Sequence, residues 1–322
     1  MLQPRFNFSH WNHLQNVSNP ELHDLVSTIP DVVNASKCSS TIKKYNIYFK
    51  KFKDWCSKYG LSFLPASVCT IAIYLNFLIQ SEVSVSVLNA AFYAKKWEHD
   101  LNLVEGVMDD NFLKMILEGG TRLLSKPLVK KEPITPKILQ QIVDKYGNTN
   151  RLPDLRICAI MLLGYAGFLR YSEISNIKAS NISFFDSHAE ITIEKSKTDV
   201  YRQGNVVVLA FLDSNLCPVS MLKKYLKAAN ILTGTNQYIF RSLSFRKSSN
   251  EHVLCNLNKP LSYTRAREIL LDALSEIGLE KTLFGLHSLR SGAASAAAQT
   301  KYPTDCSKLM ADGSQKKQKT VI

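Results

Sequence analysis

The sequence lacks the features that mark secreted, membrane-spanning and zinc-binding proteins. Its seven cysteines are odd in number and scattered, and none forms a CxxC pair, so we expect neither a disulfide framework nor a metal site. The longest apolar run, residues 157–169, falls short of the roughly 20 residues that cross a bilayer. The N-terminus has no uninterrupted apolar stretch of the signal-peptide kind. We expect an intracellular protein in a reducing compartment, with residues 157–169 as a core helix.

The composition is that of a folded protein with an excess of positive charge. The chain of 322 residues is 45% apolar, and its 40 Lys and Arg against 27 Asp and Glu give a formal charge of +13. This length suggests about two domains. A basic surface attracts phosphate-bearing partners and releases their counterions on binding, so nucleic acid or an anionic membrane surface is expected. The short apolar runs disfavour the membrane.

Periodic apolar residues predict a helical N-terminal domain over residues 36–124. We interpret residues 1–35 as a flexible arm, because they contain three prolines and show no sustained periodicity. Residues 41–59 have apolar side chains at every third or fourth position, which is typical of an amphipathic helix. Three more helices are predicted over about 66–80, 84–101 and 109–118, and Gly119-Gly120 is expected to end the last of them.

The helix over 41–59 has a stripe of lysines with a spacing of seven. Lys43 and Lys50 form one row, and Lys44, Lys51 and Lys58 form the next. A basic ridge of this kind is a candidate contact for the DNA backbone. The alternative is a solvated helix face without a partner.

Proline and lysine in residues 125–136 predict a linker, followed by a second domain over 137–300 and a basic tail over 301–322. Residues 126–322 hold 28 basic and 16 acidic side chains, whereas residues 1–125 hold 12 and 11, so the net charge resides in the second part. Short β-branched runs predict a small antiparallel sheet there. Strands are expected over 182–185, 189–194 and 205–209, and helices over 137–146, 155–169, 218–229, 262–277 and 286–299. The predicted fold is mainly α with a small antiparallel sheet.

Three segments of the second domain contain candidate site residues: GFLRYSEI (167–174), EKSKTD (194–199) and GLHSLRSGAA (285–294). His287 and Arg290 are at i and i+3 of a predicted helix, so both can reach one ligand. Each candidate has a structural alternative. Arg170 could cap the carboxyl end of its helix, and His287 could be a core histidine. Lys195 and Lys197 could pair with Glu190, Glu194 and Asp199 across the strands.

Taken in this order, behind a helical domain, these segments resemble the tyrosine recombinase, or phage integrase, family. HSLRSGAASAAA and KSKTDVYRQGN are similar to eukaryotic mobile-element members of the Crypton or DIRS type. The resemblance covers roughly residues 35 to 300. It implies a four-helix core-binding (SAM-like) domain followed by an α+β catalytic domain. It also implies DNA integration and recombination through a phosphotyrosine intermediate, with double-stranded DNA as partner, assembly as a homo-oligomer on DNA, and no metal or nucleotide cofactor.

The resemblance also assigns roles to the candidate residues. Arg170 and Arg290 would clamp the phosphate, since two guanidiniums can hold its oxygens bidentately while staying ionised. Lys197 matches the family's proton donor to the leaving 5′ oxygen, with Lys195 as the alternative. His287 would donate to the phosphate or assist proton transfer. Glu173 would hold local structure.

The C-terminal part departs from the family pattern. The family's nucleophile is a tyrosine several turns beyond HxxR, preceded by a His or Trp. Here His287 is the last histidine, and Tyr302, in KYPTD, is the only tyrosine after Arg290. Tyr302 comes too early for that nucleophile, so the chain is expected to be C-terminally incomplete. We expect a nuclear DNA-binding protein that is inactive in cis. The alternatives are an active recombinase, using Tyr302 or a tyrosine supplied in trans, and a non-catalytic module that binds protein or RNA.

Overall fold

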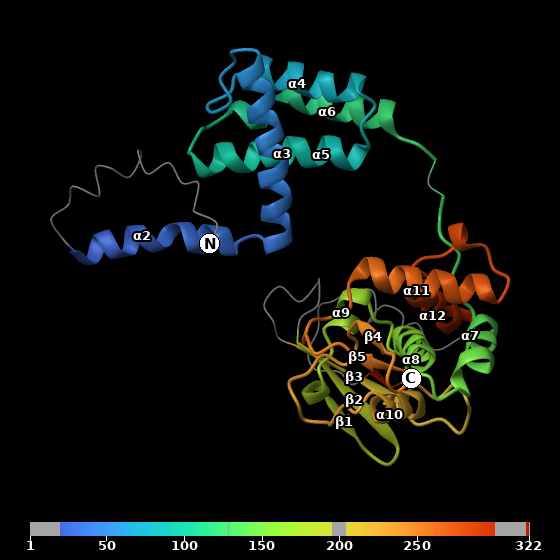
Figure 1. The fold of residues 1–322 in the computed structure, drawn as a ribbon. Helices are drawn as coiled ribbons and strands as arrows, with labels where there is room; N and C mark the ends of the chain where they lie inside the picture. Colours follow the sequence, from blue (N-terminus) through green and yellow to red (C-terminus); the bar gives the residue numbers. More distant parts are fainter. Residues whose placement is uncertain (1–19, 128, 195–203, 300–319, 322) are drawn as a thin grey trace. The chain divides into compact units, whose positions relative to one another are not determined.

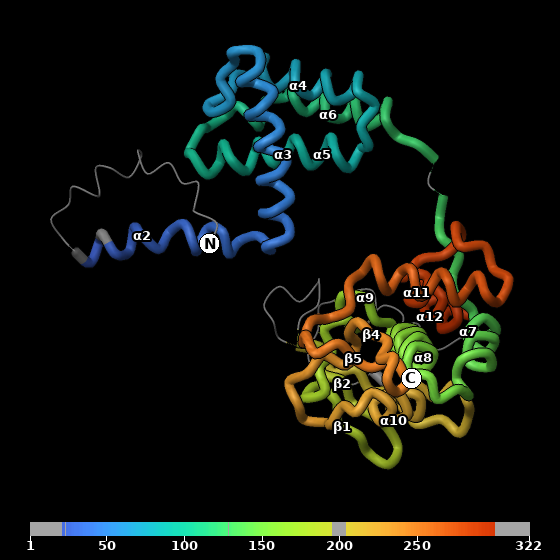
Figure 2. Tube along the Cα trace, in the orientation of Figure 1, coloured from blue at the N-terminus to red at the C-terminus, as the bar shows by residue number. Residues whose placement is uncertain are grey.

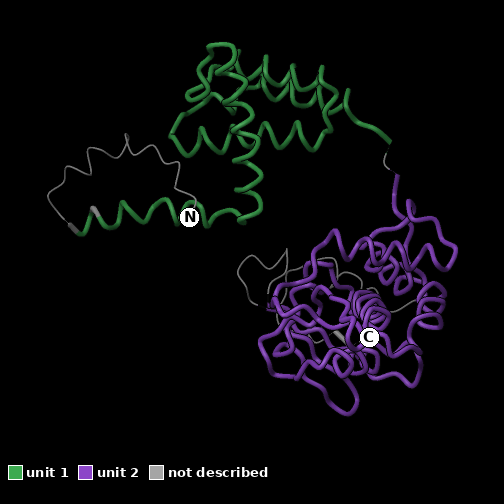
Figure 3. The backbone as a smooth tube through the Cα atoms, in the orientation of Figure 1, with its two compact units in different colours: residues 1–128 green, residues 129–322 purple. Residues whose placement is uncertain are grey.

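The computed structural model describes residues 20–127, 129–194, 204–299 and 320–321, and the chain divides into two compact units (Figures 1 and 3). Unit 1 comprises residues 1–128 and unit 2 residues 129–322. The division falls inside the segment 125–136, whose composition predicts a linker. Each unit has its own hydrophobic core. Within the described residues, no helix has the length and apolarity required to cross a membrane.

Unit 1 contains the predicted bundle of four helices. The helices are α3 (Ser39–Lys58), α4 (Val68–Gln80), α5 (Val85–Leu101) and α6 (Asn111–Leu124). Ser67 and Ser84 cap α4 and α5, because each hydroxyl accepts a hydrogen bond from the backbone N–H three residues later. α3 packs on α5 and buries Phe49, Phe52 and Cys56, while α6 packs on both α4 and α5. The expected helical N-terminal domain is confirmed.

The glycine pair in α6 does not end the helix, which continues to Leu124, so that expectation was wrong. A Cβ placed on Gly120 would lie 2.5 Å from Cδ1 of Ile79 and 2.9 Å from Cδ2 of Leu88. Gly120 therefore allows α6 to approach α4 and α5 closely. Packing at this position outweighs the low helix propensity of glycine, which costs about 1 kcal/mol.

A further helix, α2 (Pro20–Ala35), replaces part of the expected flexible arm. Pro20 is the first helical residue, and its missing N–H costs nothing because the N–H at that position has no partner within the helix. Pro30, in contrast, lies inside the helix. Apolar side chains recur every three or four positions from Leu22 to Val33, a pattern that the prolines obscure. In Figure 1, α2 projects from the start of α3 and lies apart from the bundle.

Unit 2 is built around α8 (Leu152–Ala166), which is buried along nearly its whole length. The apolar run 157–169 is thus mostly a core helix, as predicted, although α8 ends before Gly167. Figure 2 shows α8 almost end-on, with the other helices of the unit beside it. These helices are α7 (Pro136–Ile142, continued by a π turn at Val143–Gly147), α9 (Tyr171–Ser175), α10 (Pro218–Ala228), α11 (Tyr263–Glu276) and α12 (His287–Gln299).

The expected antiparallel sheet is present, and two additional pairings were not predicted. Strands β1 (Ile182–Phe184), β2 (His188–Ile193) and β3 (Asn205–Ala210) pair antiparallel in chain order. β6 (Thr320–Val321), from the expected basic tail, adds a parallel edge beside β3. A separate hairpin joins β4 (Leu243–Arg246) and β5 (Glu251–Leu254).

The second half of the predicted linker is fixed to unit 2. The N–H of Glu132 donates to the carbonyl of Leu283 at 2.7 Å, and the N–H of Ile134 donates to the carbonyl of Ser288 at 2.9 Å. The Ile134 side chain is fully buried. Gly292 of α12 lies against the Ile134 backbone, where a Cβ would meet the carbonyl oxygen at 1.9 Å. Only the first part of 125–136 therefore connects the units.

Candidate phosphate-binding site

The turn that follows α8 places Arg170. The N–H of Leu169 donates to the carbonyl of Gly164 at 3.1 Å, and that of Phe168 donates to Tyr165 at 3.2 Å. These are the two bonds of a Schellman motif. Phe168 takes the left-handed position with φ of +50°, which glycine usually occupies and which costs a phenylalanine about 1 kcal/mol or more. The chain reverses here, and Arg170 begins the next helix.

Arg170 is the N-cap of α9, where Glu173 fixes it at two points. The Glu173 carboxylate accepts from the Arg170 backbone N–H at 2.8 Å and from its guanidinium at 2.9 Å. The side chain of Glu173 is 6% exposed and that of Arg170 is 25% exposed. A half-buried guanidinium braced by a buried carboxylate loses little freedom when it binds a ligand through its remaining N–H groups.

Arg290 reaches the same turn from α12. Its guanidinium donates to the carbonyl of Phe168 at 2.9 Å, across 122 residues of sequence. α12 can approach α8 closely because position 164 is glycine: a Cβ there would lie 3.0 Å from Leu289 Cδ1 and 3.0 Å from Ile174 Cδ1. The left-handed conformation of Phe168 thus presents the carbonyl that orients Arg290.

The two arginines affect each other electrostatically. Burial lowers the pKa of Arg290, the positive charge of Arg170 lowers it further, and Glu173 opposes the decrease. The Arg290 guanidinium nevertheless stays ionised, because the ordinary pKa of arginine lies far above neutral pH. Two like charges beside one carboxylate leave a net positive site. Their unused N–H groups can hold the oxygens of one phosphate by charge-assisted hydrogen bonds.

The structural alternatives for Arg170 and His287 are not what the structure shows. The Arg170 guanidinium donates to Glu173 at the start of α9 and does not cap the carboxyl end of α8. His287 opens α12 and is exposed, so it is not a core histidine. In the described part of the chain its imidazole has no hydrogen-bond or ion-pair partner. His287 and Arg290 are one turn apart on α12, as the spacing predicts.

Three other candidate residues, Lys195, Lys197 and Tyr302, lie outside the described residues. The register pairs Ile193 with Asn205, so residues 194–204 connect β2 to β3, and both lysines belong to that connection. Glu194, which could pair with them across the strands, lies 3.6 Å from Lys178 and accepts from Asn181 at 2.9 Å.

The lysine stripe lies on the exposed side of α3. Lys43, Lys44, Lys50, Lys51 and Lys58 are all exposed, away from the buried side chains of the helix. Lys50 is paired with the Asp54 carboxylate at 2.6 Å. The stripe is available to a polyanion, and its geometry fits a solvated face equally well.

Sequence reasoning missed two parts of the site. The Phe168 carbonyl has no signature in the sequence, because every residue has one. Gly292 gives a weak signal in the sequence. A glycine inside the predicted helix that contains HxxR indicates either a less stable helix or close packing against a neighbour. Its contact with Ile134, more than 150 residues earlier in the chain, could not be deduced.

We expect Glu173→Ala to destabilise unit 2 by about 2 kcal/mol. The variant leaves a half-buried guanidinium without its carboxylate and the start of α9 without its acceptor. Glu173→Gln keeps an acceptor for the backbone N–H and should lose about half as much. Urea unfolding followed by far-UV circular dichroism measures both losses. Equal stability of wild type and the alanine variant would show that Glu173 does not brace Arg170.

Two sequence comparisons match this chain to known proteins. The model of the phage integrase family matches residues 133–310, more than half of the chain. An integrase/recombinase xerD homolog from Selenomonas ruminantium is 29% identical over 268 residues, which cover 82% of this chain and 75% of that protein.

Two solved structures show the same fold. A XerH site-specific recombinase on palindromic difH substrate has a TM-score of 0.57 at 14% identity, covering 85% of this chain and 73% of its own. A lambda integrase dimer on a COC′ core site has a TM-score of 0.53 at 17% identity, covering 91% and 95%. Arg170, His287 and Arg290 all fall within the segment that the family model matches. The chain belongs to the phage integrase family.

Proposed function

We propose that the chain binds duplex DNA and that unit 2 holds one backbone phosphate between Arg170 and Arg290. The observation that supports this most directly is the meeting of the two guanidiniums at the Phe168 turn. One is braced by Glu173 and the other by the Phe168 carbonyl. Binding a ligand there would require little rearrangement of either side chain.

Family membership and charge support DNA as the ligand. The solved relatives above are bound to DNA, one as a dimer, and another lambda integrase structure is a tetramer on a Holliday junction. Residues 126–322, which contain the site, have 28 basic and 16 acidic side chains. We therefore propose double-stranded DNA as the partner and a homo-oligomer as the DNA-bound form.

The chemistry open to the site is stabilisation of a phosphodiester under attack. Negative charge grows on the non-bridging oxygens as the attacking oxygen approaches, and preorganised cations oppose that charge most effectively. Arg170 and Arg290 are proposed to supply them. His287, exposed one turn before Arg290, is placed to donate to the same phosphate. Lys197, or Lys195, is proposed to protonate the leaving 5′ oxygen.

The chain is proposed to hold the phosphate without cleaving the strand on its own. Cleavage in this family requires a tyrosine oxygen that bonds to phosphorus as the 5′ oxygen leaves. Tyr302 is the only tyrosine after Arg290 and directly precedes a proline. A suicide DNA substrate tests this. We expect no covalent adduct in denaturing electrophoresis. An adduct that Tyr302→Phe abolishes would establish the active alternative, and an adduct only in mixtures with a tyrosine donor would establish catalysis in trans.

DNA affinity provides the main test. We expect Kd to rise steeply with salt. We also expect Arg170→Ala and Arg290→Ala each to weaken binding at least about tenfold, since each removes charge-assisted hydrogen bonds worth roughly 1.5–3 kcal/mol. Each should also reduce the slope of log K against log salt by about 1. Fluorescence anisotropy with a labelled duplex measures both quantities.

Arg151→Ala is the matched control. It also removes one arginine charge from unit 2, but Arg151 directly precedes the first residue of α8, whereas the arginine pair lies at the turn after the last residue of α8. It should change Kd less than about threefold. If all three variants bind DNA as wild type does, the arginine pair is not used. The third hypothesis, a module that binds protein or RNA, then becomes the better one.

Three finer points belong to this proposal. Residues 36–124 would be the core-binding domain, contacting DNA through the lysine stripe on α3, and residues 137–300 the catalytic-like domain. The motifs HSLRSGAASAAA and KSKTDVYRQGN support an affinity to Crypton or DIRS elements. Because these are mobile elements of eukaryotes, their DNA target supports a nuclear location for this chain. Imaging of a fluorescent fusion tests it.

A further inference from the structure

One row of the lysine stripe on α3 alternates with aromatic side chains. Each lysine of this row lies three or four residues from a ring, which is the spacing of neighbours on one helix face. Lys51 Nζ lies 5.3 Å from the centre of the Tyr48 ring. Lys58 Nζ lies 5.1 Å from the centre of the Tyr59 ring. Cations and rings therefore share one face, which reads in chain order Lys44, Tyr48, Lys51, Trp55, Lys58 and Tyr59.

Two rings of this face form an exposed surface with a ring of α4. The Trp55 ring centre lies 5.1 Å from that of Tyr59 and 6.1 Å from that of Phe77 on α4. Tyr59 is 53% exposed and Phe77 is 46% exposed. Trp55 is half-buried because its ring also lies against the buried Tyr74, with 5.1 Å between the ring centres. The core thus holds the middle of this surface, and we call Trp55, Tyr59 and Phe77 the aromatic platform.

The charge around the aromatic platform favours a polyanionic ligand. α3 contains six lysines and the single acid Asp54, which pairs with Lys50 at 2.6 Å. α4 contains no charged side chain. Lys44, Lys51 and Lys58 are exposed and, among the described residues, form no ion pair. Their ammonium groups are therefore available to phosphates that lie beside the rings.

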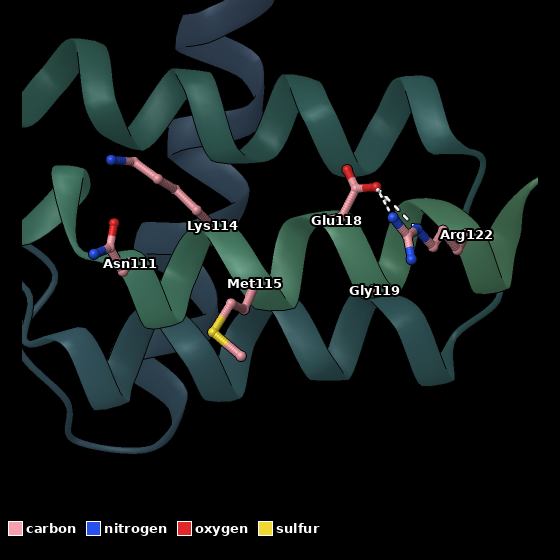
Figure 4. Close-up of a pocket in the computed structure, with 6 residues that line it drawn as sticks. All are labelled: Asn111, Lys114, Met115, Glu118, Gly119 and Arg122. Atoms are coloured by element: carbon pink, nitrogen blue, oxygen red, sulfur yellow. Dashed lines mark hydrogen bonds and ion pairs between the residues drawn. The ribbon is translucent and has the colours of Figure 1, made fainter.

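A groove along α6 is also basic but has no ring in its lining. Its two basic residues and their neighbours are Asn111, Lys114, Met115, Glu118, Gly119 and Arg122 (Figure 4). Glu118 pairs with Arg122 at 2.9 Å. This groove can attract phosphates, but none of its side chains offers a flat face to a nucleic-acid base. It provides the matched comparison for positive charge without stacking.

Exposed ring faces suit unpaired bases better than a duplex. In paired DNA the neighbouring bases cover each base face, and a protein reaches phosphates, sugars and base edges. Unpaired bases have open faces, on which aromatic side chains stack whatever the base, while a basic groove follows the backbone.

We propose that the aromatic platform stacks on unpaired bases of single-stranded DNA, with the phosphates of the strand along Lys51 and Lys58. This goes beyond the proposed contact with duplex DNA and needs no residue of unit 2. The choice of DNA over RNA rests on the proposed function, whereas the stacking does not.

Two ligands of equal charge separate stacking from charge. One is a fluorescein-labelled oligothymidylate of about 20 nucleotides, and the other is an abasic strand with the same number of phosphates. Stacking contributes on the order of 5-fold to 150-fold in affinity per base, so the full-length chain should bind the oligothymidylate at least about tenfold more tightly in fluorescence anisotropy. Equal affinity for the two strands, or no binding of the oligothymidylate, overturns the proposal. So does an oligouridylate that binds more tightly than the oligothymidylate, since it would assign the platform to RNA.

Tyr59→Leu with Phe77→Leu removes two ring faces and keeps apolar side chains at exposed positions. This variant should bind the oligothymidylate at least about fivefold more weakly, since it loses at least one stacked base. Its affinities for the abasic strand and for duplex DNA should not change, which also shows that it is folded. Tyr93→Leu with Phe112→Leu is the matched control, because these rings are 47% and 56% exposed on α5 and α6.

The control should leave all three affinities unchanged. Equal affinity of wild type and the platform variant for the oligothymidylate contradicts the proposal. Duplex binding in the same samples keeps the two proposals apart, because a chain that binds duplex DNA but not the oligothymidylate refutes only this one.

Lys51→Ala with Lys58→Ala tests the path of the strand. The loss of two phosphate contacts should reduce the slope of log K against log salt by about 1.4 for the oligothymidylate. Lys114→Ala with Arg122→Ala removes the same charge from the α6 groove and should leave the slope unchanged. If both variants reduce the slope equally, unit 1 attracts the strand through its net charge and the aromatic platform is not the site.

Discussion

Gly292→Ala is expected to unfold unit 2 under conditions in which unit 1 stays folded. The added Cβ would lie 1.9 Å from the carbonyl oxygen of Ile134 and 2.8 Å from its carbonyl carbon. Both atoms are backbone, so no side-chain rotation relieves the overlap. Either α12 or the segment around Ile134 must move, at a cost of about 3 kcal/mol or more. Because α12 contains His287 and Arg290, the proposed phosphate-binding site is lost as well.

The distribution of tryptophan makes the two units separately observable. All three tryptophans, at positions 11, 55 and 97, belong to unit 1. In the variant, thermal unfolding followed by circular dichroism should show an early transition that tryptophan fluorescence does not show. Gly285→Ala is the matched control, because nothing lies within 4 Å of its added Cβ. Circular dichroism curves that coincide for wild type and Gly292→Ala would contradict the predicted contact.

Lys95→Met is expected to stabilise unit 1 by several kcal/mol at and below pH 7. Lys95 is fully buried, and burial lowers the pKa of its ammonium to about 7. Its Nζ donates to the carbonyl of Ala91 at 2.7 Å and lies 4.5 Å from the centre of the Tyr74 ring. These contacts compensate only part of the desolvation cost of the charged form. Methionine keeps the aliphatic volume and removes the charge.

The pH dependence gives the second part of this prediction. Between about pH 7 and 10 the unfolded chain keeps the Lys95 proton and the folded chain does not. The free energy of unfolding therefore rises with pH by up to about 1.4 kcal/mol per unit. The advantage of Lys95→Met should be greatest below pH 7 and shrink towards pH 10. Urea titrations followed by tryptophan fluorescence measure it.

Lys96→Met is the control for this titration. Lys96 is the next residue, and Asp109 raises the pKa of its ammonium through a hydrogen bond. Its loss should change stability by less than about 1 kcal/mol, without a trend between pH 7 and 10. A difference between Lys95→Met and wild type that is the same at every pH would mean that Lys95 stays protonated in the folded unit.

Most helices could be predicted from sequence because their signals are local. Apolar periodicity and the capping serines before α4, α5 and α11 set their limits to within a few residues. The prediction failed where contacts with residues distant in the sequence determine the local structure. Gly120 allows close packing in α6 and does not end it, and Ile134 belongs to the core of unit 2 although prolines surround it.

The candidate site could be predicted only as a set of residue types. The motifs single out Arg170, His287 and Arg290, and the structure brings the two arginines to one turn. The acceptor that orients Arg290 is a backbone carbonyl made available by the left-handed Phe168. Neither that conformation nor the exposure of His287 follows from residue identity, since both depend on how α12 packs against α8.

The contact between Ile134 and α12 also sets the order in which the chain can fold during synthesis. Unit 1 is a helical bundle within the first 128 residues, and its contacts are complete soon after those residues leave the ribosome. Unit 2 begins with a segment whose partners are Leu283, Ser288 and Gly292. At 5–20 residues per second, about 8 to 30 s pass before those partners are made. Until α12 is made, the surface of α8 that packs against it stays uncovered, so unit 2 exposes apolar surface during synthesis for longer than unit 1 does.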